Sequence, residues 1–491
     1  MDLPDDLLIA IFVKFTVEDI ISIQQTCRVF HAFCTTDYIW HTIKIDLPLN
    51  LPHQANIKTL SGVELRKLSV TGLRVDNRWR KNPGQLRALN QLENGGIIEQ
   101  MKYLPPKWLV TMSRVTTSQG TACITLSIWD CDSASNAKRV NLISFDAVQP
   151  PTFSAALSED GLHVFIVVFA IFVPRSDTTA DALRVYRIPL QGSHFVDHSG
   201  TNYLLSRIAK SDLEGPIFDA HICGETVACL IARFSTTMDD PPTPTYHILF
   251  LNIKSGKYLT VDVDVPRPYM QLRLFPDSYF ILVGVPMKDR GSTIDLRVYD
   301  GTSLLQTLEN LETGDSSASM ALGNPCATYI STTSGSLSAA QVELELSTGQ
   351  CSTVAALSFP DHLSNQYLVR FPVHLDSDGI TRFQTHDEPN IYPFQKATTS
   401  SMVEHTSFGV SGHRAVWTER RWDLESDNTV CTIMKAAFPT GNSGPVIVGP
   451  LLPNHTALPF QIHTCQSLAL DEALGRVFIG LYTGDIYILE L

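Results

Sequence analysis

The feature that most constrains the fold of this chain is a change in the spacing of its apolar residues. Over residues 3–45 the apolar residues recur at intervals of three and four, as Leu7 and Ile11 do. This spacing places side chains along one stripe of a helix. From about residue 96 onward, short runs alternate between apolar and polar residues, which is typical of strands. The sequence therefore predicts a small helical segment followed by a large β-rich region.

The helical segment carries local signals for three short helices. Pro4 suits the first position of a helix, because the N–H that proline lacks has no helical partner there. Thr16 and Asp19 have the spacing of a capping box that begins a second helix. A third helix is predicted at residues 29–33, with Ile39 and Trp40 packing over it. So few residues cannot bury this much apolar surface among themselves. The surplus either packs on the rest of the chain or is kept for a partner.

Three blocks of this segment resemble an F-box. They are Leu3-Pro4-Asp5-Asp6-Leu7-Leu8-Ile9-Ala10-Ile11-Phe12, then Asp19-Ile20 with Thr26-Cys27-Arg28-Val29-Phe30, and finally Ile39-Trp40-His41-Thr42-Ile43. Two positions depart from the usual pattern, because Asp6 stands where Glu is common and Phe15 where Leu is common. The resemblance implies a domain over residues 1–45 that docks on the Skp-type adaptor of a cullin–RING ubiquitin ligase.

The resemblance also implies roles for individual side chains. It implies a mostly apolar contact with the adaptor, made by Leu3, Pro4, Leu7, Leu8, Ile11, Phe12, Ile20 and Cys27. Phe30 and Trp40 are expected to hold the helices together as core residues.

Residues 46–95 are predicted to form a helical and irregular connector. Pro48 and Pro52 interrupt the helical pattern, and a further helix is predicted over residues 59–73. The basic run Arg78-Trp79-Arg80-Lys81 has two interpretations, a nucleic-acid patch or a solvated linker whose tryptophan packs against a neighbour. We favour the linker, because the whole chain is acidic, with 37 Lys and Arg against 50 Asp and Glu.

The β-rich region, residues 96–491, repeats a phrase of alternating residues that ends at a turn. The phrases are residues 124–130, 183–188, 248–252, 296–300, 342–346, 430–436 and 486–491. A recurring strand phrase of this kind is typical of β-propeller blades. Residues 467–489 resemble a WD-repeat-like blade, and the order of domains resembles a fungal-type F-box protein with such a propeller. The predicted fold is mainly β, a three-helix F-box followed by a propeller of seven blades, with eight as the alternative.

Composition and motifs argue against several other functions. A net charge of −13 disfavours binding to nucleic acid or to an anionic membrane. The ten cysteines include no C-x-x-C pair, so no metal site is predicted. The longest apolar run, residues 164–173, is too short to span a membrane, which takes about 20 residues. The acidic beginning of the chain lacks the basic region of a signal peptide, so a cytoplasmic or nuclear location is expected.

We find no catalytic constellation and predict no cofactor. The sequence thus predicts a non-catalytic substrate-recognition subunit of an SCF-type ubiquitin ligase, with the F-box on the Skp-type adaptor and an unidentified target protein on the propeller. Two alternatives stay open. One is a propeller-fold hydrolase with acids and histidines along its channel, and the other is an F-box scaffold outside any ligase. The run Arg420-Arg421-Trp422-Asp423 is interpreted as a hairpin tip rather than a substrate contact.

Overall fold

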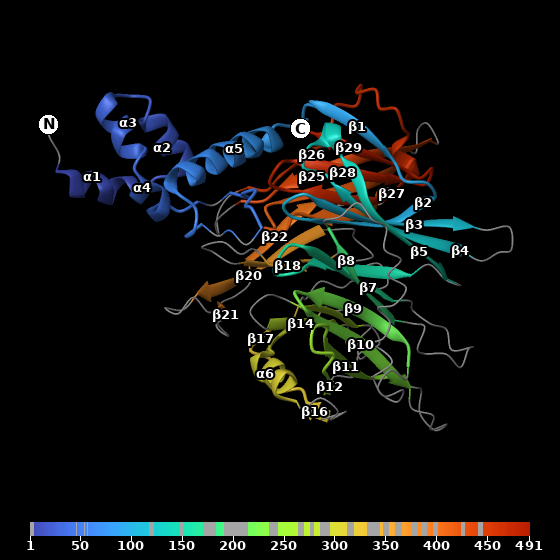
Figure 1. The fold of residues 1–491 in the computed structure, drawn as a ribbon. Helices are drawn as coiled ribbons and strands as arrows, with labels where there is room; N and C mark the ends of the chain where they lie inside the picture. Colours follow the sequence, from blue (N-terminus) through green and yellow to red (C-terminus); the bar gives the residue numbers. More distant parts are fainter. Residues whose placement is uncertain are drawn as a thin grey trace.

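The computed structural model of the chain is mainly β, with most of its helices at the N-terminus (Figure 1). It describes residues 4–45, 47–53, 55, 57–116, 122–147, 151–169, 183–190, 215–234, 244–263, 270–274, 279–284, 295–311, 319–330, 344–346, 353–358, 366–375, 381–383, 390–395, 401–423, 428–439 and 445–491. The helices in these ranges are α1 (Asp5–Phe12), α2 (Val17–Ile23), α3 (Arg28–Cys34), α4 (Asp37–Thr42), α5 (Gly62–Arg80) and α6 (Thr302–Asn310). No described helix is both long and apolar enough to cross a membrane.

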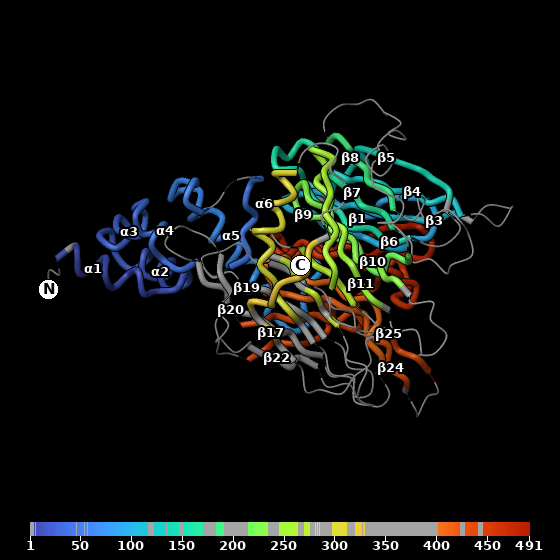
Figure 2. Tube along the Cα trace, turned by 90° about the horizontal axis from the view of Figure 1, so that it is seen from below, coloured from blue at the N-terminus to red at the C-terminus, as the bar shows by residue number. Residues whose placement is uncertain are grey.

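Helices α1 to α4 and the first turns of α5 form a small helical domain with a core of its own. This domain projects away from the sheets in both views of the chain (Figures 1 and 2). Its core contains Phe12, Val17, Ile20, Cys34, Ile39, Trp40, Ile43, Ile45 and Leu65. The capping box predicted at Thr16 and Asp19 is confirmed, because each residue's side chain bonds to the other's backbone N–H.

The third predicted helix is α3, and the residues predicted to pack over it, Ile39 and Trp40, lie in a separate helix, α4. The break falls at Thr35 and Thr36, whose hydroxyls turn back onto the last carbonyls of α3. Thr35 Oγ1 donates to the Ala32 carbonyl at 2.8 Å, and Thr36 Oγ1 donates to that of Phe33 at 2.7 Å. Side chains that satisfy carbonyls in this way end a helix. Pro4 also lies one position earlier than predicted, since it precedes the first helical residue, Asp5.

The described strands form seven sheets, and none of them closes on itself. The first four sheets, in chain order, are β2 (Ile97–Leu104), β3 (Trp108–Thr116), β4 (Ala122–Asp130) and β5 (Lys138–Ala147); β6 (Thr152–Leu157), β7 (His163–Phe169) and β8 (Leu183–Pro189); β9 (Ile217–Cys223), β10 (Thr226–Phe234), β11 (Pro244–Asn252) and β12 (Tyr258–Val263), with β16 (Ser319–Ala321) at the edge; and β13 (Met270–Leu274), β14 (Tyr279–Gly284), β15 (Asp295–Asp300) and β17 (Ala327–Ile330).

The remaining three sheets follow in chain order, and the last of them is completed by a strand that precedes the β-rich region. They are β18 (Leu344–Leu346), β19 (Thr353–Ser358), β20 (Gln366–Leu375) and β21 (Thr381–Phe383), with β22 (Asn390–Gln395) beside β20; β23 (Ser401–Phe408), β24 (Arg414–Asp423), β25 (Asn428–Ala437) and β26 (Ile447–Pro450); and β27 (Cys465–Asp471), β28 (Arg476–Leu481) and β29 (Asp485–Glu490), joined by β1 (Ala88–Glu93). Strand β1 lies inside the segment predicted as a connector. It pairs antiparallel with β29, from Ala88 opposite Glu490 to Glu93 opposite Asp485.

Neighbouring sheets pack face to face through apolar clusters. One cluster joins the sixth sheet to the seventh, and others join the seventh to the first, the first to the second, the second to the third and the third to the fourth. The first strands of these sheets lie side by side, β27 beside β23 and β2, β6 beside β2 and β9, and β9 beside β13. Each of the seven strand phrases found in the sequence lies in a different sheet, although residues 342–343 of one phrase fall outside the described residues.

Candidate functional site

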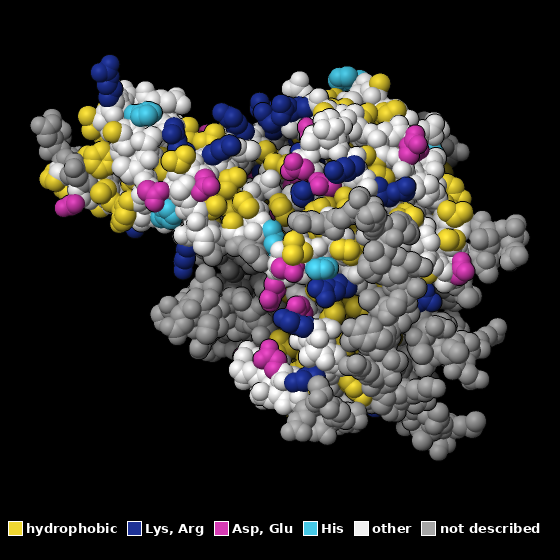
Figure 3. Space-filling view, viewed as in Figure 1, with side chains coloured by type: hydrophobic (Ala, Val, Ile, Leu, Met, Phe, Trp, Pro, Cys, Tyr) yellow, Lys and Arg dark blue, Asp and Glu magenta, His cyan; other side chains and the backbone are white. Residues whose placement is uncertain are grey.

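The outer face of the helical domain carries apolar side chains that no described residue covers. Helix α1 is apolar on two sides, because Leu8 and Phe12 point into the core whereas Leu7 and Ile11 point outward. Leu7 is 52% exposed and Ile11 is 42% exposed, and Pro4 before them is also exposed. Figure 3 shows hydrophobic side chains gathered at this end of the molecule. Unpartnered apolar side chains at i and i+4 form a stripe that suits an apolar partner.

The residues implied as adaptor contacts divide into three groups. Pro4, Leu7, Ile11 and Cys27 are exposed. Leu8, Phe12 and Ile20 are buried, and Phe12 and Ile20 belong to the core of the helical domain. The contact role that the resemblance implies for these three side chains stays a prediction. Leu3 lies outside the described residues.

Two further side chains were expected in the core, and two exposed ones were not singled out in the sequence. Trp40 is fully buried and its indole Nε1 donates to the Cys34 carbonyl at 2.7 Å. Phe30 is half-buried and its ring meets that of Phe12 edge to face, with centroids 5.6 Å apart. Val29 and Tyr38 are exposed apolar side chains of α3 and α4, and no spacing rule distinguishes them from core positions.

A histidine joins α4 to the beginning of α5. The Nδ1 atom of His41 lies 2.9 Å from the Asp37 carbonyl oxygen, and its Nε2 atom lies 2.9 Å from that of Leu60. Both partners are acceptors, so the imidazole satisfies both only when both ring nitrogens carry protons. The bonds to the Asp37 and Leu60 carbonyls accordingly raise the pKa of His41. Asp37 also accepts a hydrogen bond from the Gly62 N–H at the first residue of α5.

The other end of α5 is anchored in the β-rich region by Trp79. The predicted linker is in fact the last turn of this helix, and the Trp79 side chain is only 1% exposed. Its indole Nε1 donates to the Ala436 carbonyl at 2.9 Å. The Arg414 guanidinium and the Lys435 ammonium each lie 5.6 Å from the centroid of the ring. Contacts of a cation with an aromatic face are attractive, and more so when they are buried.

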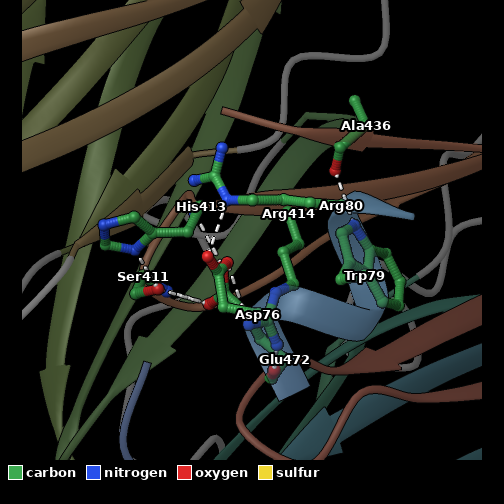
Figure 4. Close-up of polar contacts among 8 residues, drawn as sticks. All are labelled: Asp76, Trp79, Arg80, Ser411, His413, Arg414, Ala436 and Glu472. Atoms are coloured by element: carbon green, nitrogen blue, oxygen red, sulfur yellow. Dashed lines mark hydrogen bonds and ion pairs between the residues drawn. The ribbon is translucent and has the colours of Figure 1, made fainter. Parts of the chain in front are cut away.

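Beside Trp79, a polar cluster fixes the register of α5 (Figure 4). Asp76 pairs with Arg80 at 2.6 Å and with the buried Arg414 at 3.3 Å. Arg414 also donates to the Glu472 carbonyl. Burial lowers the pKa of Arg414, and the charges of Glu472 and Asp76 act against that shift. Charge pairing of this kind is what allows a guanidinium to be buried.

The Glu472 carboxylate organises the turn before Arg414. It accepts hydrogen bonds from the Ser411 and His413 N–H groups, both at 2.7 Å, and from the Ser411 hydroxyl at 2.6 Å. The carboxylate lies against Gly409, where a Cβ atom would come within 2.1 Å of Glu472 Cδ. A larger residue at this position would therefore displace the Glu472 carboxylate.

A cavity of about 280 Å³ lies among the first strands of the sheets. Its lining comes from β2, β6, β9, β13, β23 and β27, with additional residues from neighbouring segments. Polar side chains on these strands bond to the backbone of the next sheet's first strand. The bonds are Ser467 Oγ with Met101 N at 2.9 Å, Gln100 with Phe153 N and O at 3.0 Å each, Ser154 Oγ with Ile222 N at 3.3 Å, Asp219 Oδ2 with Leu272 N at 2.9 Å, and His221 Nδ1 with Leu274 N at 3.3 Å.

Two titratable groups of the cavity, Asp219 and His221, are engaged in these structural contacts. Asp219, the one carboxylate among the described lining residues, is 2.6 Å from Arg273 Nη1. Because Nδ1 of His221 accepts a backbone N–H, its ring proton is assigned to Nε2. Burial, followed by the charges of Lys102 and Arg273, holds the pKa of His221 well below its usual value. These contacts join strands, and no cluster of metal-ligating side chains occurs in the described part of the chain.

Comparison with known families identifies the helical domain. Residues 1–46 match the model of the F-box-like family, which covers α1 to α4 and ends before α5. No curated protein matches the chain. The F-box resemblance of the N-terminal segment is therefore confirmed. An F-box-like domain indicates binding to the Skp-type adaptor of a cullin–RING complex.

We expect Trp79→Ala to lower the free energy of unfolding by about 3–5 kcal/mol, because a large buried side chain is lost and a cavity remains. Trp422→Ala is the matched control, since Trp422 is 48% exposed on a hairpin, and we expect its effect to lie within about 0.5 kcal/mol. Urea unfolding followed by circular dichroism measures both. Equal effects of the two substitutions would contradict the anchoring of α5 by Trp79.

We expect the stabilisation from His41 to disappear as pH rises. Because the folded-state pKa is raised above the unfolded value of about 6.5, the stabilisation is complete below that pH and is lost as pH rises through the folded-state pKa. The difference in melting temperature between wild type and His41→Ala should shrink over this range. Subtracting the variant removes the effects of the other histidines, and a difference that stays constant with pH would contradict the doubly protonated ring.

Proposed function

We propose that the chain is the substrate-recognition subunit of an SCF-type ubiquitin ligase, with the helical domain on the Skp-type adaptor and a target protein on the β-rich region. The observation that carries the proposal is the exposed apolar stripe of α1. It lies in the domain that matches the F-box-like family and at the end of the molecule that faces away from the sheets (Figure 1). Pro4, Leu7, Ile11 and Cys27 are the proposed contacts.

We propose that the β-rich region is a WD-repeat-like propeller of seven blades. Three observations support this proposal: the seven described sheets, the face-to-face packing of successive sheets, and the hydrogen bonds between first strands around one cavity. Strand β1, which directly precedes the β-rich region, supplies the outer strand of the seventh sheet, so the beginning and the end of the β-structure meet in one blade. Projection images along the cavity axis test the count, and six or eight radial sheets would overturn it.

In this proposal the chain contributes no reacting group. An adaptor of this kind accelerates transfer by holding the target near the charged enzyme, which raises its effective concentration. The junction at Trp79 and Arg414 serves that role, because it sets the separation between the two binding regions. The hydrolase alternative is not favoured, because Asp219 is paired with Arg273. The proposed location is the cytosol or nucleus.

We expect Leu7→Asp with Ile11→Asp to weaken binding to the Skp-type adaptor by at least about 100-fold. Each apolar side chain contributes about 1.5 kcal/mol or more when buried, and about 1.4 kcal/mol is a tenfold change. Both side chains are exposed, so the fold should survive, unlike with substitution of Leu8. Val63→Asp on α5 is the control, because Val63 is 74% exposed and lies outside the family match.

Co-purification and calorimetric titration with the purified adaptor measure the effect. Retention of wild-type affinity by the double variant would remove the basis of the proposal. Cullin recruitment by the complex then distinguishes a ligase subunit from a scaffold, because a scaffold binds the adaptor without bringing the cullin.

A further inference from the structure

The solvent-facing side of α5 carries a row of five residues, four of which are cations. Lys67, Thr71, Arg74, Arg78 and Lys81 follow one another at intervals of four, three, four and three, so they share one face of the helix and its end. We call this row the basic stripe. Lys67, Arg74 and Lys81 are exposed and Arg78 is half-buried. Lysine and arginine side chains are visible along this part of the surface (Figure 3).

The orientation of the basic stripe is fixed by the opposite face of α5. That face is buried and contains Leu65, Ser69, Gly72, Val75, Asp76 and Trp79. Leu65 belongs to the core of the helical domain, and Trp79 belongs to the cluster between the sixth and seventh sheets. The helix cannot rotate without breaking both cores, so the stripe faces solvent permanently.

Helix stability accounts for only part of the composition of the stripe. An exposed helix face is stabilised when acids and bases alternate at i and i+4, whereas like charges at that spacing destabilise it by a few tenths of a kcal/mol. Arg74 and Arg78 are such a like-charged pair, and Lys81 follows three residues later. Within the described residues no carboxylate forms an ion pair with any of the four cations. The helix dipole favours Arg78 and Lys81 near the C-terminal end, but it gives no reason for Lys67 or Arg74.

We propose that the basic stripe binds an acidic segment of a protein partner. From Lys67 to Lys81 the stripe is about 21 Å long at about 1.5 Å per residue, which matches an extended peptide of roughly six residues. The proposal does not depend on adaptor binding, since the family match ends before α5.

Charge and side-chain type favour a protein over a nucleic acid. The chain as a whole has a net charge of −13, so a long polyanion that extends past the stripe meets repulsion. Binding to single-stranded nucleic acid also relies on exposed aromatic rings for stacking, and the aromatic ring of this part of α5, Trp79, is buried. A short acidic peptide needs neither further positive charge nor a stacking surface.

The test compares two charge reversals in the full chain. Lys67→Glu with Arg74→Glu removes half of the cations of the stripe. Lys138→Glu with Arg187→Glu is the matched control, because both residues are exposed on the sheets and the net charge changes equally. The probe is a fluorescein-labelled oligo-glutamate peptide, and binding is measured by fluorescence anisotropy below and at an ionic strength of about 0.15 M. We expect the stripe variant to lose at least about tenfold in affinity, the control to bind like wild type, and binding to weaken with salt.

Three results would overturn the proposal. They are no binding of the peptide by wild type at low salt, equal loss in the stripe variant and the control, and tighter binding of a single-stranded RNA than of the peptide by wild type. Melting temperature checks the fold, and it should be unchanged or higher in the stripe variant, since Glu at position 74 lies four residues before Arg78. If the melting temperature of the stripe variant falls, the variant Lys67→Gln with Arg74→Gln is used in its place. The same loss of affinity is expected for it.

Discussion

The placement of the helical domain depends on the burial of Trp79 beside Arg414 and Lys435. An indole ring in this position satisfies its own N–H at the Ala436 carbonyl and faces two cations, one of which also meets Asp76 on the same helix. A buried guanidinium is costly without its charged partner. If α5 slid by one turn, Asp76 would leave Arg414 and Trp79 would leave its site. The position of α5 along its own axis, relative to the sheets, is therefore fixed by these contacts.

Helix α5 belongs to two cores, and this makes it a rigid connection. Its first turns bring Leu65 into the helical domain, where His41 and Asp37 hold the helix start, and its last turn brings Trp79 into the sheets. A second contact supports the connection, because His53 Nε2 lies 3.1 Å from the Ser158 carbonyl beside the second sheet. In the proposed adaptor role, a fixed connection would set the distance between the two partners without a flexible search.

Local signals in the sequence predict the class of fold and the F-box-like domain, because both depend on neighbouring residues. The recurring strand phrase also follows the architecture, since six of the seven phrases form the third strand of their sheets, from β4 to β29. Contacts between distant residues were not predictable. Nothing in residues 88–93 indicates that they pair with residues 485–490. On α1, Leu7 with Ile11 and Leu8 with Phe12 have the same spacing, so the sequence does not show which pair is buried.

The two exposed stripes differ in the physical character of the binding they support. The stripe of α1 is apolar, and burial of apolar surface is insensitive to moderate salt, so it suits a lasting contact. The basic stripe of α5 acts through charges in water, which salt screens within about 10 Å, so it suits rapid and reversible capture. Both stripes lie on helices whose other faces are buried in the same core or in the sheets. A partner held on one stripe therefore keeps a fixed position relative to a partner on the other, without any change in the fold.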